Sequence, residues 1–291
     1  MSQVKQAPVV AVLNMKGGVG KTTISAHLLR VVYQRAKRNC LLIDLDPQFN
    51  LTQVLLRRQD YEPLRDAHKT IYSVMEEPTD IGLFVVTPSQ APAPDPKTLA
   101  KEVHSYTSAE GRLSLDLIPG DFALVKYSLM DHDAKLGEVQ KRFLEFVELA
   151  RANYGLVCID CNPSSSFITS CAVQAATHLL IPVKPDLYSV IGVELLHKLL
   201  SHQKAKHPKP ATIILLNNLQ GRAFDAKIEN ELRGHPTFGR EVLAGSLRYS
   251  KLLVASPSAT GFATDRRGPW PSRLYNDLLP IADELVKRLG L

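Results

Sequence analysis

The sequence has few of the features that mark secreted, disulfide-bonded or membrane-spanning proteins. Its 291 residues include only four cysteines and one tryptophan. No apolar run approaches the roughly 20 residues of a membrane-spanning helix, and the N-terminus has no charged segment followed by a long apolar stretch. We therefore expect no secretory signal. The cysteines lie in apolar or strand-end contexts, where reduced thiols in the cytoplasm are the expected state.

The bulk composition is that of an ordinary globular protein. Hydrophobic residues make up 45% of the chain and charged residues 22%. The sequence shows no internal repeat, and its length suits one large α/β domain. We therefore expect a single domain over residues 1–291.

Short continuous apolar runs alternate with helical patterns along the chain. Such runs suit parallel strands buried on both faces. Their alternation with helices predicts an α/β fold, with a doubly wound, mostly parallel sheet and helices on both faces. The active site should then lie at the carboxyl ends of the strands. The expected strands are residues 9–13, 40–43, 115–118, 156–159, 178–183 and 212–216, and the expected helices are residues 24–35, 138–153, 167–175, 191–204 and 273–289.

One segment, residues 80–112, interrupts this alternation. Four prolines fall within residues 87–97, and proline fits neither a helix interior nor a central strand. We expect an exposed loop or insertion here.

The most informative stretch reads Val-Ala-Val-Leu-Asn-Met-Lys-Gly-Gly-Val-Gly-Lys-Thr-Thr and covers residues 10–23. A strand, a glycine-rich turn and a helix in this order form a phosphate-binding loop. Its glycines, Gly17, Gly18 and Gly20, allow backbone N–H groups to converge on phosphate oxygens. Lys21 would reach the β- and γ-phosphates, and the Thr22 hydroxyl would ligate Mg²⁺.

The loop departs from the generic pattern Gly-x-x-x-x-Gly-Lys-Ser/Thr, because Met15 replaces its first glycine and Lys16 adds a second lysine. The string Lys-Gly-Gly-Val-Gly-Lys-Thr-Thr resembles the deviant Walker A loop of the ParA/MinD group of P-loop ATPases. The resemblance implies ATP and Mg²⁺ as cofactors, and a Lys16 that reaches across a dimer interface to the partner's nucleotide. The implied nucleotide contacts are Lys16, Gly17, Gly18, Val19, Gly20, Lys21, Thr22 and Thr23.

Two carboxylates follow the second expected strand, in the string Leu-Leu-Ile-Asp-Leu-Asp-Pro-Gln-Phe-Asn-Leu-Thr at residues 41–52. Carboxylates beside a phosphate loop suit water positioning and metal-shell roles. The string resembles the family's Asp-x-Asp-Pro-Gln-x-Asn element. By this resemblance Asp44 is catalytic, with Lys16 and Lys21, and Asp46 lies near Mg²⁺. Phe49 stands where family members often have glycine, so the local turn should differ. A simpler alternative is that the carboxylates cap the following helix.

A third carboxylate, Asp160, ends another apolar run and completes a Walker B pattern, whose aspartate typically holds a Mg²⁺-bound water. The expected metal-site residues are thus Thr22, Asp46 and Asp160. Cys158 and Cys161 have Cys-x-x-Cys spacing. Because residues three apart in a strand point to opposite faces, we expect no metal or redox pair here.

Two asparagines follow the expected strand at residues 212–216. A side-chain amide offers a donor and an acceptor, as recognition of an adenine edge requires. The family commonly has an asparagine there, and we favour Asn217 over Asn218. A turn-forming asparagine is the alternative.

The last third of the chain is basic. From residue 197 onward there are 15 Lys and Arg against 8 Asp and Glu, a net charge of +7, whereas the whole chain carries +6. Such a region suits phosphate-backbone contact, although a merely solvated basic surface is the alternative. Residues 245–250 resemble a family segment that contacts DNA non-specifically. Aromatic residues are sparse here, which favours contacts with duplex phosphates. The candidate DNA contacts are Arg248, Lys251, Arg222, Arg266 and Arg267.

Together these patterns predict a ParA-like ATPase. Mg²⁺ and ATP would close a homodimer that binds DNA without sequence preference, and a ParB-like or other adaptor protein would stimulate hydrolysis. The protein would segregate a plasmid or chromosome and lie in the cytoplasm at the nucleoid. One alternative is a MinD-like ATPase that cycles on membranes. Three acidic residues in the last expected helix, Asp277, Asp283 and Glu284, oppose that reading, so we expect no membrane partner. Another alternative is an ATP-dependent reductase or metabolic enzyme of the same fold.

Overall fold

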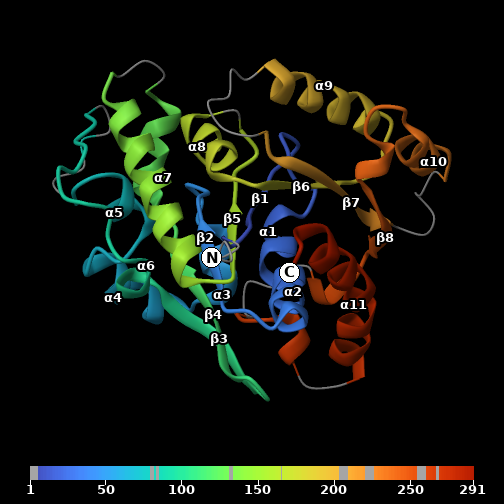
Figure 1. The fold of residues 1–291 in the computed structure, drawn as a ribbon, viewed down its shortest axis with the longest axis horizontal. Coiled ribbons are helices and arrows are strands. Elements are labelled where there is room, and N and C mark those ends of the chain that lie inside the picture. Colours follow the sequence, from blue (N-terminus) through green and yellow to red (C-terminus); the bar gives the residue numbers. More distant parts are fainter. Residues whose placement is uncertain are drawn as a thin grey trace, which may run out of the picture.

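One sheet of eight strands organises the residues that the structure describes (Figure 1). The structure is a computed structural model that describes residues 6–78, 82, 85–130, 134–164, 166–202, 209–219, 226–253, 260–266 and 269–291. The strand order is β3 (Lys101–Ser108), β4 (Gly111–Ile118), β2 (Cys40–Asp44), β5 (Leu156–Asp160), β1 (Val9–Val12), β6 (His178–Val183), β7 (Ala211–Leu219) and β8 (Val242–Arg248). Neighbouring strands run parallel except β3, which is antiparallel to β4.

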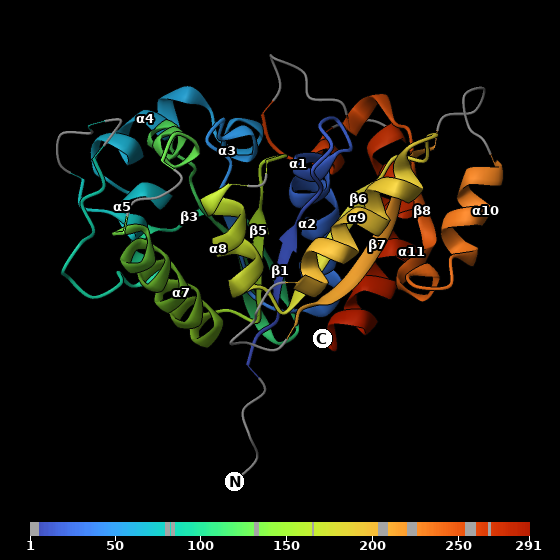
Figure 2. The same cartoon turned by 90° about the horizontal axis from the view of Figure 1, so that it is seen from above.

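Helices cover both faces of this sheet (Figures 1 and 2). One face carries α7 (Leu136–Asn153), α8 (Phe167–Ala175) and α9 (Ser189–His202), and the other carries α2 (Leu29–Ala36) and α11 (Pro269–Leu289). A hydrophobic core lies on each face of the sheet, and alternate strand residues point into one core or the other. Ala11 and Ile159 face the first group of helices, and Val12 and Cys158 face the second. The predicted doubly wound α/β fold is thereby confirmed.

Shorter helical segments connect the main elements, and most of them lie near the ends of strands. They are α1 (Lys21–Thr23), the π-helical segment η1 (Ile24–Leu28), α3 (Asn50–Leu55), α4 (Arg58–Asp66), α5 (Ile71–Met75), α6 (Pro96–Leu99), η2 (Phe122–Ser128), α10 (Ala226–Gly234), η3 (Gly239–Glu241), η4 (Lys251–Leu253) and η5 (Ala263–Asp265).

The expected loop at residues 80–112 is only partly a loop. Residues 85–95 form neither helix nor sheet strand, but β3 lies within the expected insertion and pairs with β4 as an edge strand. Its sequence, Lys-Glu-Val-His-Ser-Tyr-Thr-Ser, is polar because an edge strand remains partly exposed. Because the expected strands were identified as apolar runs, β3 was not among them. The strand β8 was missed for a related reason, since Ala244, Gly245 and Ser246 interrupt its apolar pattern.

The C-terminal helix α11 packs its apolar side inward. Leu274, Leu278, Ile281 and Leu285 are buried against the core that α2 shares. The face that a membrane-binding helix would need is therefore occupied within the molecule. Over the part of the chain that is described, none of the helices has the length and apolar character that crossing a bilayer demands.

Candidate functional site

The glycine-rich loop lies between β1 and the helical segment that begins at Lys21. Gly18 and Gly20 have φ angles of 72° and 90°, in the left-handed region that favours glycine. A Cβ on Gly20 would lie 2.2 Å from Nδ2 of Asn217, whereas one on Gly17 or Gly18 would meet nothing within 4 Å. The loop is thus packed on one side and open on the other, as a phosphate cradle requires.

Lys21 is folded into this loop. Its Nζ donates to the main-chain oxygens of Asn14, at 3.1 Å, and Lys16, at 3.3 Å. Burial lowers the pKa of Lys21, while the charges of Asp160 and Asp46 oppose that change. The ammonium is therefore held beside the two carboxylates that the sequence assigns to the metal site.

The Lys16 side chain contacts residues of its own chain. Its backbone N–H donates to Oδ1 of Asn14 at 2.9 Å. Its ammonium pairs with the carboxylate of Asp186, and the Lys16 side chain remains 51% exposed. The sequence did not indicate Asp186, since 170 positions separate the two residues. The only available signal was that Asp186 closely follows the carboxyl end of β6.

Asp160 is buried at the end of β5 and is bonded to two hydroxyls. Oγ1 of Thr22 donates to its Oδ2 at 2.9 Å, and Oγ of Ser25 donates to its Oδ1 at 2.6 Å. Burial raises the pKa of Asp160 to about 6, and these two hydrogen bonds limit the rise. Two expected metal-site residues, Thr22 and Asp160, are thus already in contact. Ser25 was missed, although it lies one helical turn after Thr22 and faces the same way.

Asp44 lies beside Asp160 on the neighbouring strand β2. Its Oδ2 accepts from the backbone N–H of Thr52 at 2.8 Å and from Oγ1 of Thr52 at 2.7 Å. Burial, followed by the charge of Asp160, raises the pKa of Asp44 to about 8, while the bonds from Thr52 lower it. Gly120 covers this carboxylate so closely that a Cβ on it would lie 2.9 Å away. The sequence indicated neither Thr52 nor Gly120 as part of the site.

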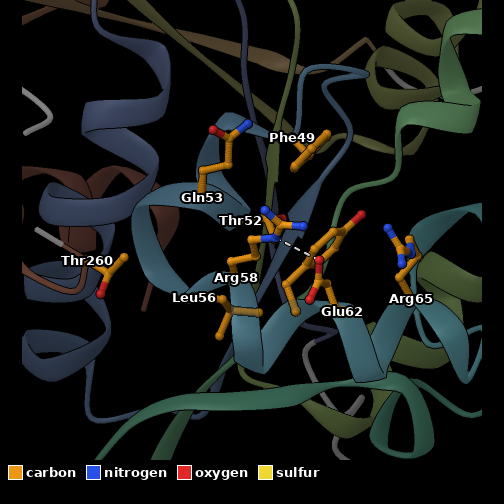
Figure 3. A pocket seen from close by; sticks show the side chains of 9 residues that line it. Phe49, Thr52, Gln53, Leu56, Arg58, Glu62, Arg65 and Thr260 are labelled. Carbon is orange, nitrogen blue, oxygen red and sulfur yellow. Dashed lines mark hydrogen bonds and ion pairs between the residues drawn. The ribbon is translucent and has the colours of Figure 1, made fainter. Parts of the chain in front are cut away.

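The segment after β2 turns with a backbone conformation that favours glycine, and the expected difference from the family's turn stays a prediction. Asp46 accepts from the backbone N–H of Gln48 at 2.9 Å and from Nδ2 of Asn50 at 3.2 Å. Phe49 adopts a left-handed φ of 41°, which is uncommon for a residue other than glycine. Its ring stacks on Tyr61 with centroids 5.4 Å apart. This segment lines a cleft of about 490 Å³ between α3 and α4 (Figure 3).

Asn217 reaches the phosphate loop from β7. Its Nδ2 donates to the carbonyl oxygen of Val19 at 2.6 Å, and the residue is buried. In this structure the amide nitrogen therefore holds the loop, and adenine recognition by Asn217 stays a prediction. The side chain of Asn218 lies outside the described residues.

The Cys-x-x-Cys pair is split between the two faces of the sheet, as its spacing suggested. Cys158 packs in the core beside α2 and α11, with its Sγ 3.9 Å from Sγ of Cys40. Cys161 is buried in the opposite core, and burial raises the pKa of its thiol. Among the described residues, no group of three or more His, Cys, Asp or Glu side chains could hold a metal ion.

The basic candidates in the last third of the chain are only partly brought together. Arg248 ends β8 and is exposed, and Lys251 lies just beyond it. Arg266 lies near His27, whose pKa is lowered to about 4 by burial and then by the charges of Arg266 and Arg30. Arg222 and Arg267 lie outside the described residues.

A cleft of about 620 Å³ adjoins Arg248 and contains two aromatic rings, two cations and one carboxylate. Its lining includes Tyr249, Lys251, Trp270, Arg273 and Asp277. The guanidinium of Arg273 lies 5.7 Å from the ring centroid of Trp270, which is 63% exposed. The sequence showed the aromatic residues as sparse, but folding brings two of them beside two cations.

Comparisons with known proteins agree with this architecture. A family model described as an AAA domain matches residues 7–211. A ParA family protein of Chlamydia trachomatis is 30% identical over 282 residues, which cover 95% of this chain and 96% of that protein. The chain spans only 41% of the length of a putative replication protein A from Sinorhizobium fredii, to which it is 28% identical.

Two solved structures show the same fold. The pNOB8 ParA bound to nonspecific DNA has a TM-score of 0.64 and 20% identity, and the match covers 98% of this chain and 99% of that one. A cobyrinic acid a,c-diamide synthase from Mycobacterium smegmatis, with bound ATP analog and magnesium, has a TM-score of 0.65 and 20% identity over 98% of this chain and 96% of that one. Sequence, loop geometry and fold together place this chain in the ParA family, with the fold of P-loop NTPases.

Proposed function

We propose that the chain hydrolyses ATP with Mg²⁺ and uses the cycle to bind and release DNA. The observation that carries the proposal is that the carboxyl ends of β1, β2 and β5 meet at the glycine-rich loop. This arrangement brings together Lys21, the Thr22–Asp160 pair and Asp44. A synthase of the same fold, solved with bound ATP analog and magnesium, supports the choice of ligand.

The residues present fit that ligand. The open side of the loop at Gly17 and Gly18 leaves backbone N–H groups accessible to phosphate oxygens. The Thr22 hydroxyl and the Asp160 carboxylate are oxygen ligands of the kind that Mg²⁺ prefers. When bound, Mg²⁺ would neutralise charge on the phosphate oxygens. Lys21 would bind the phosphates, and Asp44 would orient the attacking water.

Asp44 must lose its proton to act in this way. With a pKa near 8, its carboxyl is mostly protonated at neutral pH in the ligand-free chain. A cation entering the site would favour the carboxylate form. We infer that ligand binding charges Asp44, which links catalysis to an assembled site.

The dimer and its adaptor belong to the same proposal. Lys16 would leave Asp186 and contact the phosphates of a partner subunit, so that hydrolysis depends on a homodimer. An adaptor protein of the ParB type would stimulate hydrolysis and end the DNA-bound state. The resemblance of the loop at residues 16–23 to the deviant Walker A motif supports this reading.

DNA would bind at the basic edge beyond β8. Arg248 and Lys251 are exposed there, and Trp270 and Arg273 lie in the adjoining cleft. The pNOB8 ParA was solved on nonspecific DNA, and contacts to phosphates carry no sequence information. The output would be segregation of a plasmid or chromosome.

DNA titrations with ATP, with ADP and without nucleotide test the proposal. Trp270 is the only tryptophan in the chain, so its fluorescence reports directly on this surface. We expect quenching by DNA with ATP and little change with ADP. Arg248→Glu should weaken binding and reduce its dependence on salt. Lys141→Glu, a charge reversal at an exposed lysine of α7, is the control.

Two outcomes would contradict the proposal. An unchanged salt dependence in Arg248→Glu would place the DNA on another surface. Co-sedimentation with anionic vesicles in ATP, without any DNA binding, would favour the membrane-cycling alternative.

A further inference from the structure

The two oxygens of the Asp44 carboxylate have different surroundings. Oδ2 accepts two hydrogen bonds from Thr52, one from its backbone N–H at 2.8 Å and one from its hydroxyl at 2.7 Å. Among the described residues, Oδ1 accepts only from the backbone N–H of Asp46, at 3.3 Å, which is long for a hydrogen bond. Each carboxylate oxygen accepts about two hydrogen bonds. Oδ2 is therefore fully used, whereas Oδ1 keeps the capacity to accept another bond.

Gly120 fixes the direction in which the Thr52 hydroxyl donates. This buried glycine follows the carboxyl end of β4, and its backbone N–H donates to Oγ1 of Thr52 at 2.8 Å. Because a backbone N–H can only donate, the hydroxyl accepts there and its single proton is left for another acceptor. Within the described chain, the acceptor that this proton meets is Oδ2 of Asp44. The hydrogen bonds therefore run in one direction, from Gly120 through Thr52 to Asp44.

Gly120 also covers Oδ2 of Asp44 sterically. A Cβ on Gly120 would lie 2.9 Å from this oxygen and 2.7 Å from Cβ of Phe49. The glycine is held from its other side as well, because its carbonyl oxygen accepts from the Tyr61 hydroxyl at 3.2 Å. A backbone packed this closely, together with the two donors of Thr52, leaves no room for a water molecule at Oδ2. An attacking water can therefore meet the carboxylate only at Oδ1.

A simpler role for Asp44 is to cap the helix α3. The backbone N–H of Thr52 lies in the first turn of α3, where N–H groups have no partner within the helix. Phe49, the N-cap residue, makes no side-chain hydrogen bond to them, and Oδ2 of Asp44 supplies an acceptor instead. This cap needs only the bond from the N–H. It does not account for the second bond from the hydroxyl, nor for the bond from Gly120 that directs it.

We propose that Thr52 is a positioning residue for ATP hydrolysis. Anchored by Gly120, its hydroxyl holds Oδ2 of Asp44, so that Oδ1 is the oxygen that accepts a hydrogen bond from the attacking water. The proposal rests on the proposed function, in which Asp44 orients that water. One carboxylate then has two roles, because Oδ2 ties β2 to α3 and Oδ1 acts on the water. A misplacement of about 1 Å in such a group can lower a rate about 100-fold.

Turnover of Thr52→Val at saturating ATP and Mg²⁺ tests the proposal. Valine has nearly the shape of threonine and keeps the backbone N–H that donates to Asp44, but it lacks the hydroxyl. We expect kcat to fall about tenfold or more, while the affinity for ATP, measured by calorimetry, changes less than about twofold. Such a split indicates the loss of an interaction made in the transition state. Thr52→Ser, which keeps the hydroxyl, should recover most of the lost turnover.

Thr177→Val is the matched control. Thr177 precedes β6, at the opposite edge of the sheet from Asp44. Its hydroxyl also accepts from a backbone N–H, that of Val9 at 2.9 Å, and donates to an oxygen, the carbonyl of Val9 at 3.0 Å. Loss of this hydroxyl should lower the stability and leave kcat unchanged. Equal losses of turnover in the two valine variants would attribute the effect to stability and overturn the proposal.

Hydrogen exchange of the Gly120 amide, followed by NMR, tests the anchor directly. In the wild type this amide should exchange slowly, because it is buried and bonded to Thr52. In Thr52→Val it loses its acceptor and should exchange about tenfold faster or more, whereas in Thr52→Ser it should stay protected. Rapid exchange in the wild type would overturn the proposal even if Thr52→Val were too unstable to assay.

The outcomes distinguish this proposal from the function on which it rests. A wild-type chain that hydrolyses no ATP would contradict the proposed function, and the role of Thr52 would fall with it. A wild type that hydrolyses ATP, with unchanged kcat in Thr52→Val, would overturn the role of Thr52 alone. Loss of turnover in Thr52→Val without recovery in Thr52→Ser would overturn it too, because the hydroxyl would then not be the cause.

Discussion

Replacing Asp44 with asparagine should stabilise the ligand-free chain at neutral pH, and the gain should shrink in acid. The Asp44 carboxyl is fully buried, and burial together with the charge of Asp160 raises its pKa to about 8. In the unfolded chain an aspartate has a pKa of about 3.9. Because the folded pKa is the higher one, the stabilising contribution of Asp44 is complete below about pH 4 and is lost as the pH rises toward 8.

The size of the effect follows from this difference. Between about pH 5 and pH 7 the unfolded chain releases the Asp44 proton while the folded chain keeps it. Each pH unit in that interval costs the wild type up to about 1.4 kcal/mol of unfolding free energy. An asparagine keeps the acceptor for Thr52 and has no proton to lose. The advantage of Asp44→Asn should therefore grow by about 1–3 kcal/mol across this interval.

Urea unfolding of both proteins without nucleotide, at about pH 5, 6 and 7, measures this difference. Asp160, with a pKa of about 6, adds pH dependence to both proteins and largely cancels in the comparison. Asp66→Asn, at an exposed carboxyl of α4, is the control and should show no comparable trend. A difference between wild type and Asp44→Asn that stays constant with pH would refute the reasoning. The same variant should bind ATP but lose turnover, because its amide cannot act as a carboxylate toward water.

Three other substitutions test separate parts of the structure. Lys16→Ala should keep ATP binding but lose adaptor-stimulated hydrolysis in a turnover assay; retained stimulation would remove the lysine from its proposed role. Gly20→Ala should weaken ATP binding at least tenfold by calorimetry, about 1.4 kcal/mol or more, because its Cβ would overlap Asn217; unchanged affinity would show that the loop can shift. Lys126→Met should lower the unfolding free energy by about 3–5 kcal/mol, since it leaves the buried Glu76 unpaired. A second change, Glu76→Gln, should recover part of that loss, and no recovery would mean that the ion pair is not the cause.

The sequence was sufficient for the parts of the site that follow from chain order. A glycine-rich turn after a strand must sit at the carboxyl edge of a parallel sheet. Asp44 and Asp160 end two further strands, so their meeting follows once the sheet is inferred. The register that pairs these two residues is what places them side by side.

The sequence was insufficient where contacts depend on segments far apart. Thr52 and Gly120 enclose Asp44, but nothing in their local patterns marks them. The edge strand β3 lacks an apolar run because its outer side faces water. Trp270 and Tyr249 looked isolated in the sequence, yet the start of α11 and the end of β8 bring them to one cleft. Such placements depend on tertiary packing, which overrides local composition.

The Lys16–Asp186 pair links the nucleotide loop to α9. While this ion pair is formed, the Lys16 ammonium stays bound to its own chain and does not reach a partner's phosphates. An ion pair this exposed contributes only about 0–1 kcal/mol, so a triphosphate, which carries several negative charges, can compete for the lysine. Asp186 lies in the turn between the end of β6 and the start of α9. Release of Lys16 would therefore break this ion pair at the carboxyl edge of the sheet, where the partner subunit is proposed to approach. The ion pair would thus hold Lys16 on its own chain until a nucleotide competes for it.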